Sequence, residues 1–199
     1  MSTTTTDRVL TEAFGPTEGM GLWIKQVALV VAGIAALAIF AKIKVPMWPV
    51  PITMGTFAVL TIGATYGSRL GLATILGYMI IGAFGFDVFA SSSADAYGLT
   101  YMMGGTGGYL LGYVLATLAL GCAARAGWDR SILGMAAAML IGTVLIYIPG
   151  LLWLGQLYGW DQPILQWGLT PFLIGDALKL LLAALLVPTV WKFVGDARR

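Results

Sequence analysis

Six long apolar segments divide this chain, and most approach the ~20 residues that a helix needs to cross a lipid bilayer. Only 10% of the residues are charged, whereas a soluble domain carries about 25%. The sequence therefore predicts an all-α integral membrane protein, folded as a bundle of six transmembrane helices. The predicted segments are residues 22–41, 52–66, 70–86, 107–124, 132–154 and 169–193.

The second and third segments are the shortest, and only Gly67, Ser68 and Arg69 separate them. We expect these two helices to tilt little, or to fall short of the full thickness of the bilayer. No internal repeat is visible, which argues against a large carrier built from duplicated halves.

Basic residues set the expected orientation. If the segments alternate in direction, Lys42 and Lys44 fall on one side of the membrane and eight other basic residues on the opposite side. Basic loops stay in the cytoplasm, so both termini are predicted to be cytoplasmic in a multi-pass protein of the cytoplasmic (inner) membrane. Residues 1–20 are polar and Thr-rich, and we expect a flexible cytoplasmic tail before a membrane domain over residues 21–199. The eight residues are Arg8, Lys25, Arg69, Arg125, Arg130, Lys192, Arg198 and Arg199.

Composition excludes several classes of function. The chain has no histidine and a single cysteine, Cys122, which removes His-based zinc sites, Ser-His-Asp triads and histidine proton relays. A net charge of +2 gives no reason to expect a nucleic-acid partner. Neither a phosphate-binding loop nor a base–nucleophile set is readable, so we expect no enzyme, no cofactor and no metal.

Asp176 and Lys179 are two opposite charges inside the last apolar segment, within the stretch Pro171 to Leu182. Their i, i+3 spacing puts both side chains on one face of a helix. Charges within a membrane are costly and mark functional sites by default. A structural ion pair that holds this helix to a neighbour would offset the same cost. The sequence therefore leaves both a functional and a structural role open for the pair.

The three loops on the outer side differ in character. The loop from Lys42 to Pro51 contains three prolines, which hold an extended path of fixed shape. The loop from Asp87 to Thr106 is long and rich in small and polar residues, and it could act as a lid over a pocket. The loop from Gly155 to Gly168 carries two tryptophans, which we interpret mainly as membrane-interface anchors.

Two rows of small residues allow close approach. Glycines from Gly104 to Gly112 could let backbone approach a ligand, or could pack helices together, because Gly104, Gly108 and Gly112 recur every four residues. Ala28, Ala32 and Ala36 form a similar row in the first segment. Internal packing is the usual explanation for such a row, and docking of a partner protein is the more specific alternative.

Three local signatures together resemble the BioY family, the biotin-specific substrate-capture (S) components of energy-coupling-factor (ECF) transporters. They are P-V-P-I-T at residues 49–53, G-x-T-G-G-Y-L-L-G-Y at 104–113 and P-F-L-x-G-D-x-L-K at 171–179. The resemblance covers essentially the whole chain after Gly21. The sequence departs from the family pattern in two places: Met54-Gly55-Thr56 stands where L-Q-T is usual, and Gly105 replaces a proline.

The resemblance implies high-affinity capture of biotin in a pocket near the outer face of the bundle. It also implies that the Ala28, Ala32 and Ala36 face docks a transmembrane coupling subunit, which acts with ATPase subunits. The alternative from another class is an autonomous vitamin carrier driven by an ion gradient, with the Asp176–Lys179 pair as its coupling site.

The expected substrate-binding residues follow from the chemistry of biotin. Asp176 would accept from the ureido N–H groups, and Lys179 would bind either the ureido carbonyl or the valerate carboxylate. Three residues at the start of the fourth segment would supply hydrogen-bond donors or let the backbone approach biotin closely. Three aromatic side chains would enclose the thiophane ring, with plain packing inside the protein as the alternative for each. Thr53, in the first signature, completes the set. The two groups of three are Thr106, Gly107 and Gly108, and Trp48, Tyr109 and Tyr147.

Overall fold

The computed structural model describes residues 8–90 and 97–196. Within them, five helical stretches are long and apolar enough to cross a membrane, which makes the chain an all-helical, multi-pass membrane protein. They contain α1 (Gly19–Lys42), α2 (Gly55–Ala83), α4 (Gly107–Arg125), α5 (Ile132–Tyr158) and α7 (Leu173–Asp196). The last stretch, Ile164–Val194, also includes the short helix α6 (Ile164–Gly168) and the 3-10 turn η4 (Thr170–Phe172).

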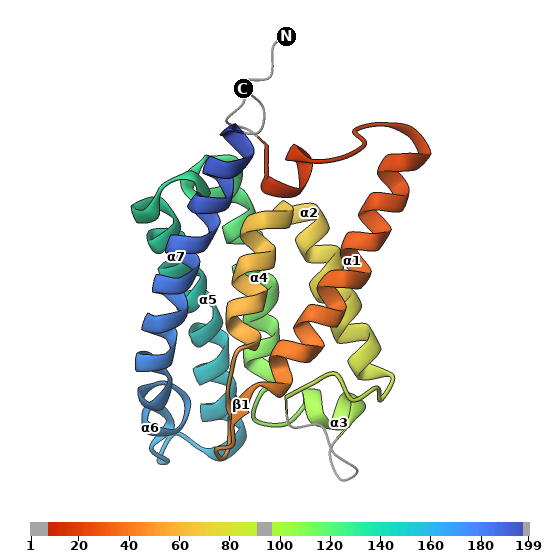
Figure 1. Ribbon diagram of the computed structural model, residues 1–199. Coiled ribbons are helices and arrows are strands. Elements are labelled where there is room, and N and C mark those ends of the chain that lie inside the picture. Colours follow the sequence, from red (N-terminus) through yellow and green to blue (C-terminus); the bar gives the residue numbers. More distant parts are fainter. Residues whose placement is uncertain (1–7, 91–96, 197–199) are drawn as a thin grey trace.

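Helix α2 contains both of the short segments predicted from the sequence, and it folds back on itself at Gly67. There the backbone has φ 76° and ψ 175°, a region that is essentially restricted to glycine. A Cβ placed on Gly71 would lie only 3.6 Å from the Cα atom of Gly63, although eight residues span about 12 Å along a straight helix. The arms, roughly 18 and 24 Å long at ~1.5 Å per residue, therefore lie against each other (Figure 1).

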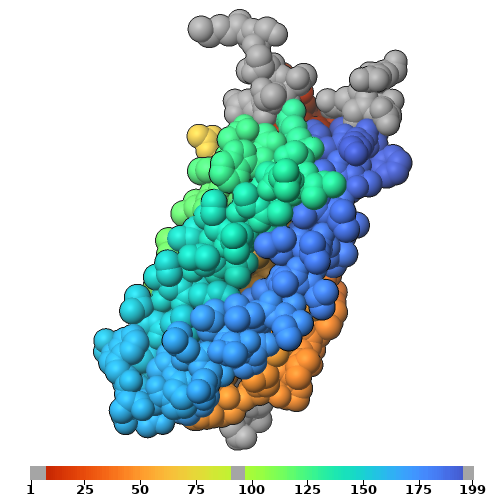
Figure 2. Space-filling view, turned by 90° about the vertical axis from the view of Figure 1, so that its left-hand side faces the viewer, coloured from red at the N-terminus to blue at the C-terminus, as the bar shows by residue number. Residues whose placement is uncertain are grey.

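The remaining helices are arranged around α4. Helix α4 packs against α2 on one side and α5 on the other, α1 packs mainly on α2, and α7 packs mainly on α5. Figure 2 shows the face built by α5 and α7, with the orange residues near position 50 beside α7 at its lower end. Most of α1 is exposed, and its buried positions, Gly33, Leu37 and Ala41, form one narrow stripe.

The short elements gather at one end of the bundle. A two-stranded antiparallel hairpin pairs β1 (Lys44–Val45) with β2 (Ile52–Thr53). The hairpin, α3 (Gly98–Met102) and α6 lie at the end opposite to the one where α1 begins and α7 ends (Figure 1). We call these the hairpin end and the terminal end.

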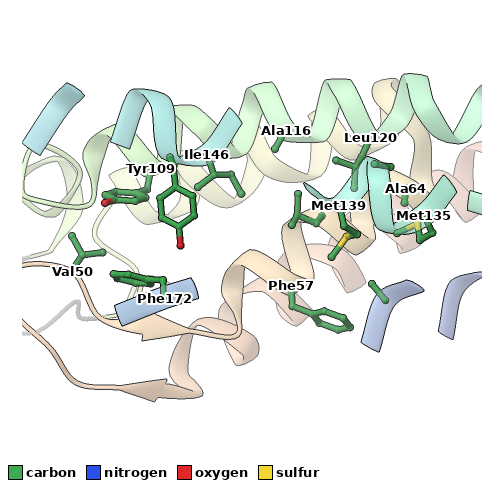
Figure 3. Close-up of a cluster of buried hydrophobic side chains, with 14 of the residues drawn as sticks. Val50, Phe57, Ala64, Tyr109, Ala116, Leu120, Met135, Met139, Ile146 and Phe172 are labelled. Carbon is green, nitrogen blue, oxygen red and sulfur yellow. The ribbon is translucent and has the colours of Figure 1, made fainter. Parts of the chain in front are cut away.

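The core is a continuous column of apolar side chains between α2, α4, α5 and α7. It extends from Val50, Tyr109 and Phe172 to Ala64, Leu120 and Met135 (Figure 3). Because lipid is as apolar as these side chains, close packing rather than the hydrophobic effect holds such helices together.

The terminal end contains an element that the sequence did not reveal. We expected residues 1–20 to be a flexible tail; residues 1–7 lie outside the described residues, and the next few form a 3-10 turn, η2 (Leu10–Ala13). Val9 is fully buried, and the Glu12 carboxylate pairs with Arg125 of α4 at 2.7 Å. The described part of this segment therefore packs on the bundle.

A second 3-10 turn, η3 (Trp128–Arg130), joins α4 to α5 at the same end. Asp129 is buried, and its Oδ2 accepts a hydrogen bond of 2.5 Å from the indole N–H of Trp191. Burial raises the pKa of the Asp129 carboxyl to about 6, although this hydrogen bond and the nearby Arg130 guanidinium lower it. The Arg130 guanidinium also lies 4.5 Å from the centre of the Trp191 ring, so η3 anchors the end of α7.

We expect Gly67→Ala to lower the free energy of unfolding by about 2–3 kcal/mol, since it combines backbone strain with contact of the new Cβ on Val9 at 3.1 Å. Gly127→Ala is the matched control. Gly127 also has a positive φ, of 83°, but its Cβ would meet nothing within 4 Å, so a cost of about 1 kcal/mol is expected. Thermal unfolding in detergent measures both, and equal losses would contradict the role assigned to the reversal.

Candidate ligand-binding site

A cavity opens among the helices near the hairpin end. It holds about 750 Å³ of space between the surrounding atoms, including the part that opens to solvent. Its lining comes from α1, the hairpin, both arms of α2, α4, α5 and α7. Predicted site residues among the lining are Thr53, Thr106, Tyr109, Tyr147, Asp176 and Lys179.

The ion pair predicted from the sequence is present at the wall of this cavity. The Lys179 ammonium lies 2.9 Å from the Asp176 carboxylate, and the two side chains are only 8% and 12% exposed. Asp176 lies in the first turn of α7, where the helix dipole stabilises a negative charge. The helix therefore supports the carboxylate locally, and Lys179 neutralises it one turn later.

Two further polar side chains complete this network. The hydroxyl of Tyr147, on α5, donates to Asp176 Oδ2. The Lys179 ammonium donates to the Thr56 hydroxyl, at the start of α2, over 2.9 Å. The sequence analysis missed Thr56 as a site residue. Thr56 follows the first signature and begins an apolar segment, and this position was the only indication in the sequence that it could belong to a site. Nothing in the sequence shows that α2 and α7 meet there.

Thr53 has a structural contact as well as a place on the cavity wall. Its hydroxyl accepts a hydrogen bond of 3.0 Å from the backbone N–H of Gly55, the first residue of α2. This contact satisfies one of the donors that a helix N-terminus leaves free. Thr53 therefore helps to fix where α2 begins, and with it the position of Thr56.

Aromatic rings supply much of the remaining wall. The Tyr109 hydroxyl donates to the carbonyl of Gly168 over 2.8 Å, and its ring centre lies 6.2 Å from that of Tyr147. Tyr147 in turn meets Phe172 edge-on. Further lining residues that the sequence analysis did not single out are Tyr78, Phe89, Tyr101, Tyr113 and Thr143. Tyr113 ends the second signature, so that motif was a usable signal for it.

Three predicted site residues do not line the cavity. Trp48 is 65% exposed and packs against Trp167 and Tyr158 with ring centres 5.0 and 5.4 Å apart. A Cβ on Gly108 would lie 2.3 Å from the carbonyl oxygen of Pro149, and one on Gly107 would lie 2.2 Å from that of Met102. These two glycines therefore allow close backbone packing around the start of α4. Of the two roles that the sequence left open for the glycines, ligand approach and helix packing, this is the second.

The loop that we expected to act as a lid is only partly described, because residues 91–96 lie outside the described residues. The part before them is held to the first outer loop. Lys42 pairs with Asp87 at 2.5 Å and donates to the carbonyl of Phe89, and Lys44 donates to that of Ala90. Phe89 is buried and stacks on Tyr101, so this stretch forms cavity wall.

The alanine row of α1 lies beside the buried stripe of this helix and not within it. Ala28 and Ala32 are exposed and Ala36 is half-buried, whereas the helix buries the stripe through Gly33 and Leu37. Internal packing therefore does not account for Ala28 and Ala32. Among residues 8–90 and 97–196, no cluster of three or more acidic or cysteine side chains could hold a metal ion.

Removing one member of the charge pair should destabilise the ligand-free fold, because it strands the other charge in an apolar wall. We expect Lys179→Met to cost about 3–5 kcal/mol. The double variant Asp176→Asn/Lys179→Met carries no charge there and should recover most of that loss. Thermal unfolding in detergent compares them, and a double variant as unstable as Lys179→Met would show that the pair is not what stabilises this wall.

The family model described as the BioY family matches residues 7–196. A protein of Pyrococcus horikoshii named "Probable biotin transporter BioY" is 33% identical over 162 residues, which cover 81% of this chain and 93% of that protein. The "Biotin transporter BioY" of Thermotoga maritima is 31% identical over 160 residues, which cover 79% of this chain and 92% of that protein.

A solved structure shares the fold. It is described as "Crystal structure at 2.1 A of the S-component for biotin from an ECF-type ABC transporter", and it matches with a TM-score of 0.71 at 18% sequence identity. The match covers 88% of this chain and 95% of that one. The resemblance suggested by the three signatures is thus confirmed: this chain belongs to the BioY family.

Proposed function

We propose that this chain captures biotin at the outer face of the cytoplasmic membrane, and that it does so as the substrate-specific component of an ECF-type transporter. The observation that carries the proposal is the buried Asp176–Lys179 pair on the wall of a cavity that α1, α2, α4, α5 and α7 line together. The names of the relatives, as biotin transporters, supply the ligand. The chain acts as a transport component and carries out no reaction.

The free hydrogen-bonding capacity of the pair suits a ureido ring. An ionised carboxylate offers about four acceptor positions, and Asp176 uses one for Tyr147 and one for Lys179. The rest can accept the two ureido N–H groups. The Lys179 ammonium has three donors, of which Asp176 and Thr56 take two. Its third can bind the ureido carbonyl or the valerate carboxylate.

The remaining lining suits the rest of the molecule. The edge-on rings of Tyr109, Tyr147 and Phe172 offer apolar surface for the thiophane ring and the valerate chain. Thr53 and Thr106 provide hydroxyl groups at the wall. In this assignment Gly107 and Gly108 do not contact biotin; they allow the close packing that positions the start of α4. Trp48 lies outside the pocket and packs against Tyr158 of α5 and Trp167 of α6.

The proposed topology has six membrane passes, with the two arms of α2 counted separately and both termini in the cytoplasm. Support comes from α1 beginning and α7 ending at the same end of the bundle (Figure 1). The positive-inside rule favours the same orientation, because basic residues are retained on the cytoplasmic side. The basic residues concerned are Lys25, Arg69, Arg125, Arg130 and Lys192. The hairpin end and the cavity then face outwards.

We assign the exposed alanine row of α1 to docking of the transmembrane coupling subunit, which works with ATPase subunits. Small side chains let two helices approach closely within a bilayer, and Ala28 and Ala32 are exposed. The autonomous ion-driven carrier is not favoured, because the relatives carry the name of biotin transporters and the fold matches that of an S-component.

Asp176→Asn should weaken biotin binding by roughly 30-fold or more, because truncating a buried charged partner costs about 2–5 kcal/mol. Lys179→Ala should have an effect of similar size. Calorimetric titration of the purified variants with biotin measures both.

The exposed pair near the same end provides a control of matched chemistry. Asp87→Asn removes a carboxylate that also accepts from a lysine but whose side chain is 68% exposed, so its effect on affinity should be less than about fivefold. Unchanged affinity in a folded Asp176→Asn protein would remove Asp176 from the proposed site.

Ala32→Trp should leave biotin binding intact but abolish uptake in cells that contain the energising subunits. A bulky side chain on the alanine row would hold the coupling subunit away. The control is Val31→Trp, one position along, where the native side chain is already 61% exposed on another face of α1. Loss of binding in purified Ala32→Trp protein would instead indicate that the row supports the fold.

A further inference from the structure

A second cavity lies at the terminal end, between η2, α1, α2 and the end of α4. It encloses about 980 Å³, including space open to solvent. The proposed transport function makes no use of it. Its lining includes three cationic side chains from three different helices, Lys25, Arg69 and Arg125, against one acidic side chain, Glu12.

The charges that line this cavity are not balanced. Glu12 is neutralised, because Arg125 holds its two oxygens at 2.7 and 3.4 Å. Lys25 donates to the carbonyl oxygens of Phe14 and Pro16 over 2.6 and 3.3 Å, and its ammonium has three donors. Arg69 is exposed and takes part in none of the salt bridges found within residues 8–90 and 97–196. The site therefore has cationic donors available for an anion.

Apolar side chains continue the cavity along the two helices. Leu22 and Leu29 of α1 line it, with Lys25 and Gln26 between them, and their separation of seven positions corresponds to about 10 Å of helix. Leu70 and Ala73 of the second α2 arm complete the apolar part. Cationic side chains beside leucines, in one cavity between membrane helices, match an amphiphile with an anionic head and a long hydrocarbon chain.

We propose that this cavity binds an anionic phospholipid, with its phosphate at Arg69 and Lys25 and one acyl chain along the groove between α1 and the second arm of α2. A soluble phosphate shares the head-group chemistry but cannot use Leu22, Leu29, Leu70 and Ala73. Phosphate is held well by arginine, whose planar fork donates two parallel hydrogen bonds. In the proposed topology the lipid comes from the cytoplasmic leaflet.

The test is native mass spectrometry of the full-length protein with phosphatidylglycerol and phosphatidylcholine of the same acyl chains. The wild-type protein should retain one phosphatidylglycerol in preference to phosphatidylcholine. Arg69→Gln and Lys25→Gln should each weaken that binding by about fivefold or more. Lys192→Gln is the matched control, because Lys192 is an exposed cation at the same end that does not line the cavity, and it should bind like wild type.

Three results would overturn the proposal. Equal retention of the two lipids by the wild-type protein, a comparison that needs no variant, would exclude recognition of the anionic head. Equal losses in Arg69→Gln and Lys192→Gln would indicate general surface attraction. Displacement of phosphatidylglycerol from the wild-type protein by millimolar inorganic phosphate would indicate a site for a soluble anion.

Discussion

Two opposite charges within an apolar helix are the constraint on which this structure depends. Moving an ion out of water costs several kcal/mol even after relaxation, so Asp176 and Lys179 require partners nearby. The partners come from two other helices: Tyr147 on α5 and Thr56 at the start of α2. The requirement to satisfy these charges therefore fixes how α2, α5 and α7 meet, and the cavity lies where they meet.

Close backbone packing makes this arrangement possible. The reversal at Gly67 brings the two arms of α2 together, and α4 can approach α5 because Gly112 lies where a Cβ would be 2.6 Å from the Cα atom of Ile146. Tyrosines projecting from α4 and α5 then share one cavity wall. Apolar packing gives the bundle its shape, and the polar network gives the cavity its chemistry.

Hydropathy and helical periodicity were enough to predict an all-helical membrane protein and the pairing of Asp176 with Lys179, because both depend on residues close in sequence; the short helices α3 and α6 and the joining of the second and third segments into α2 were not predicted. Contacts between distant segments were not predictable in this way. Thr56 is separated from Lys179 by 123 positions, and the packing of Trp48 on Trp167 depends on how an irregular loop crosses the bundle. A pattern of small residues shows that something approaches closely, but not whether that is a ligand or a helix; for Gly108 the neighbour is the carbonyl of Pro149.

The most direct test of the central claim is calorimetric titration of the purified, detergent-solubilised protein with biotin, with thiamine and riboflavin as controls. We expect tight binding of biotin at one site per chain and no heat of binding from the other two vitamins. A folded protein that binds none of the three, or binds all of them alike, would contradict the claim. In that case the cavity around Asp176 and Lys179 would have to serve a different ligand.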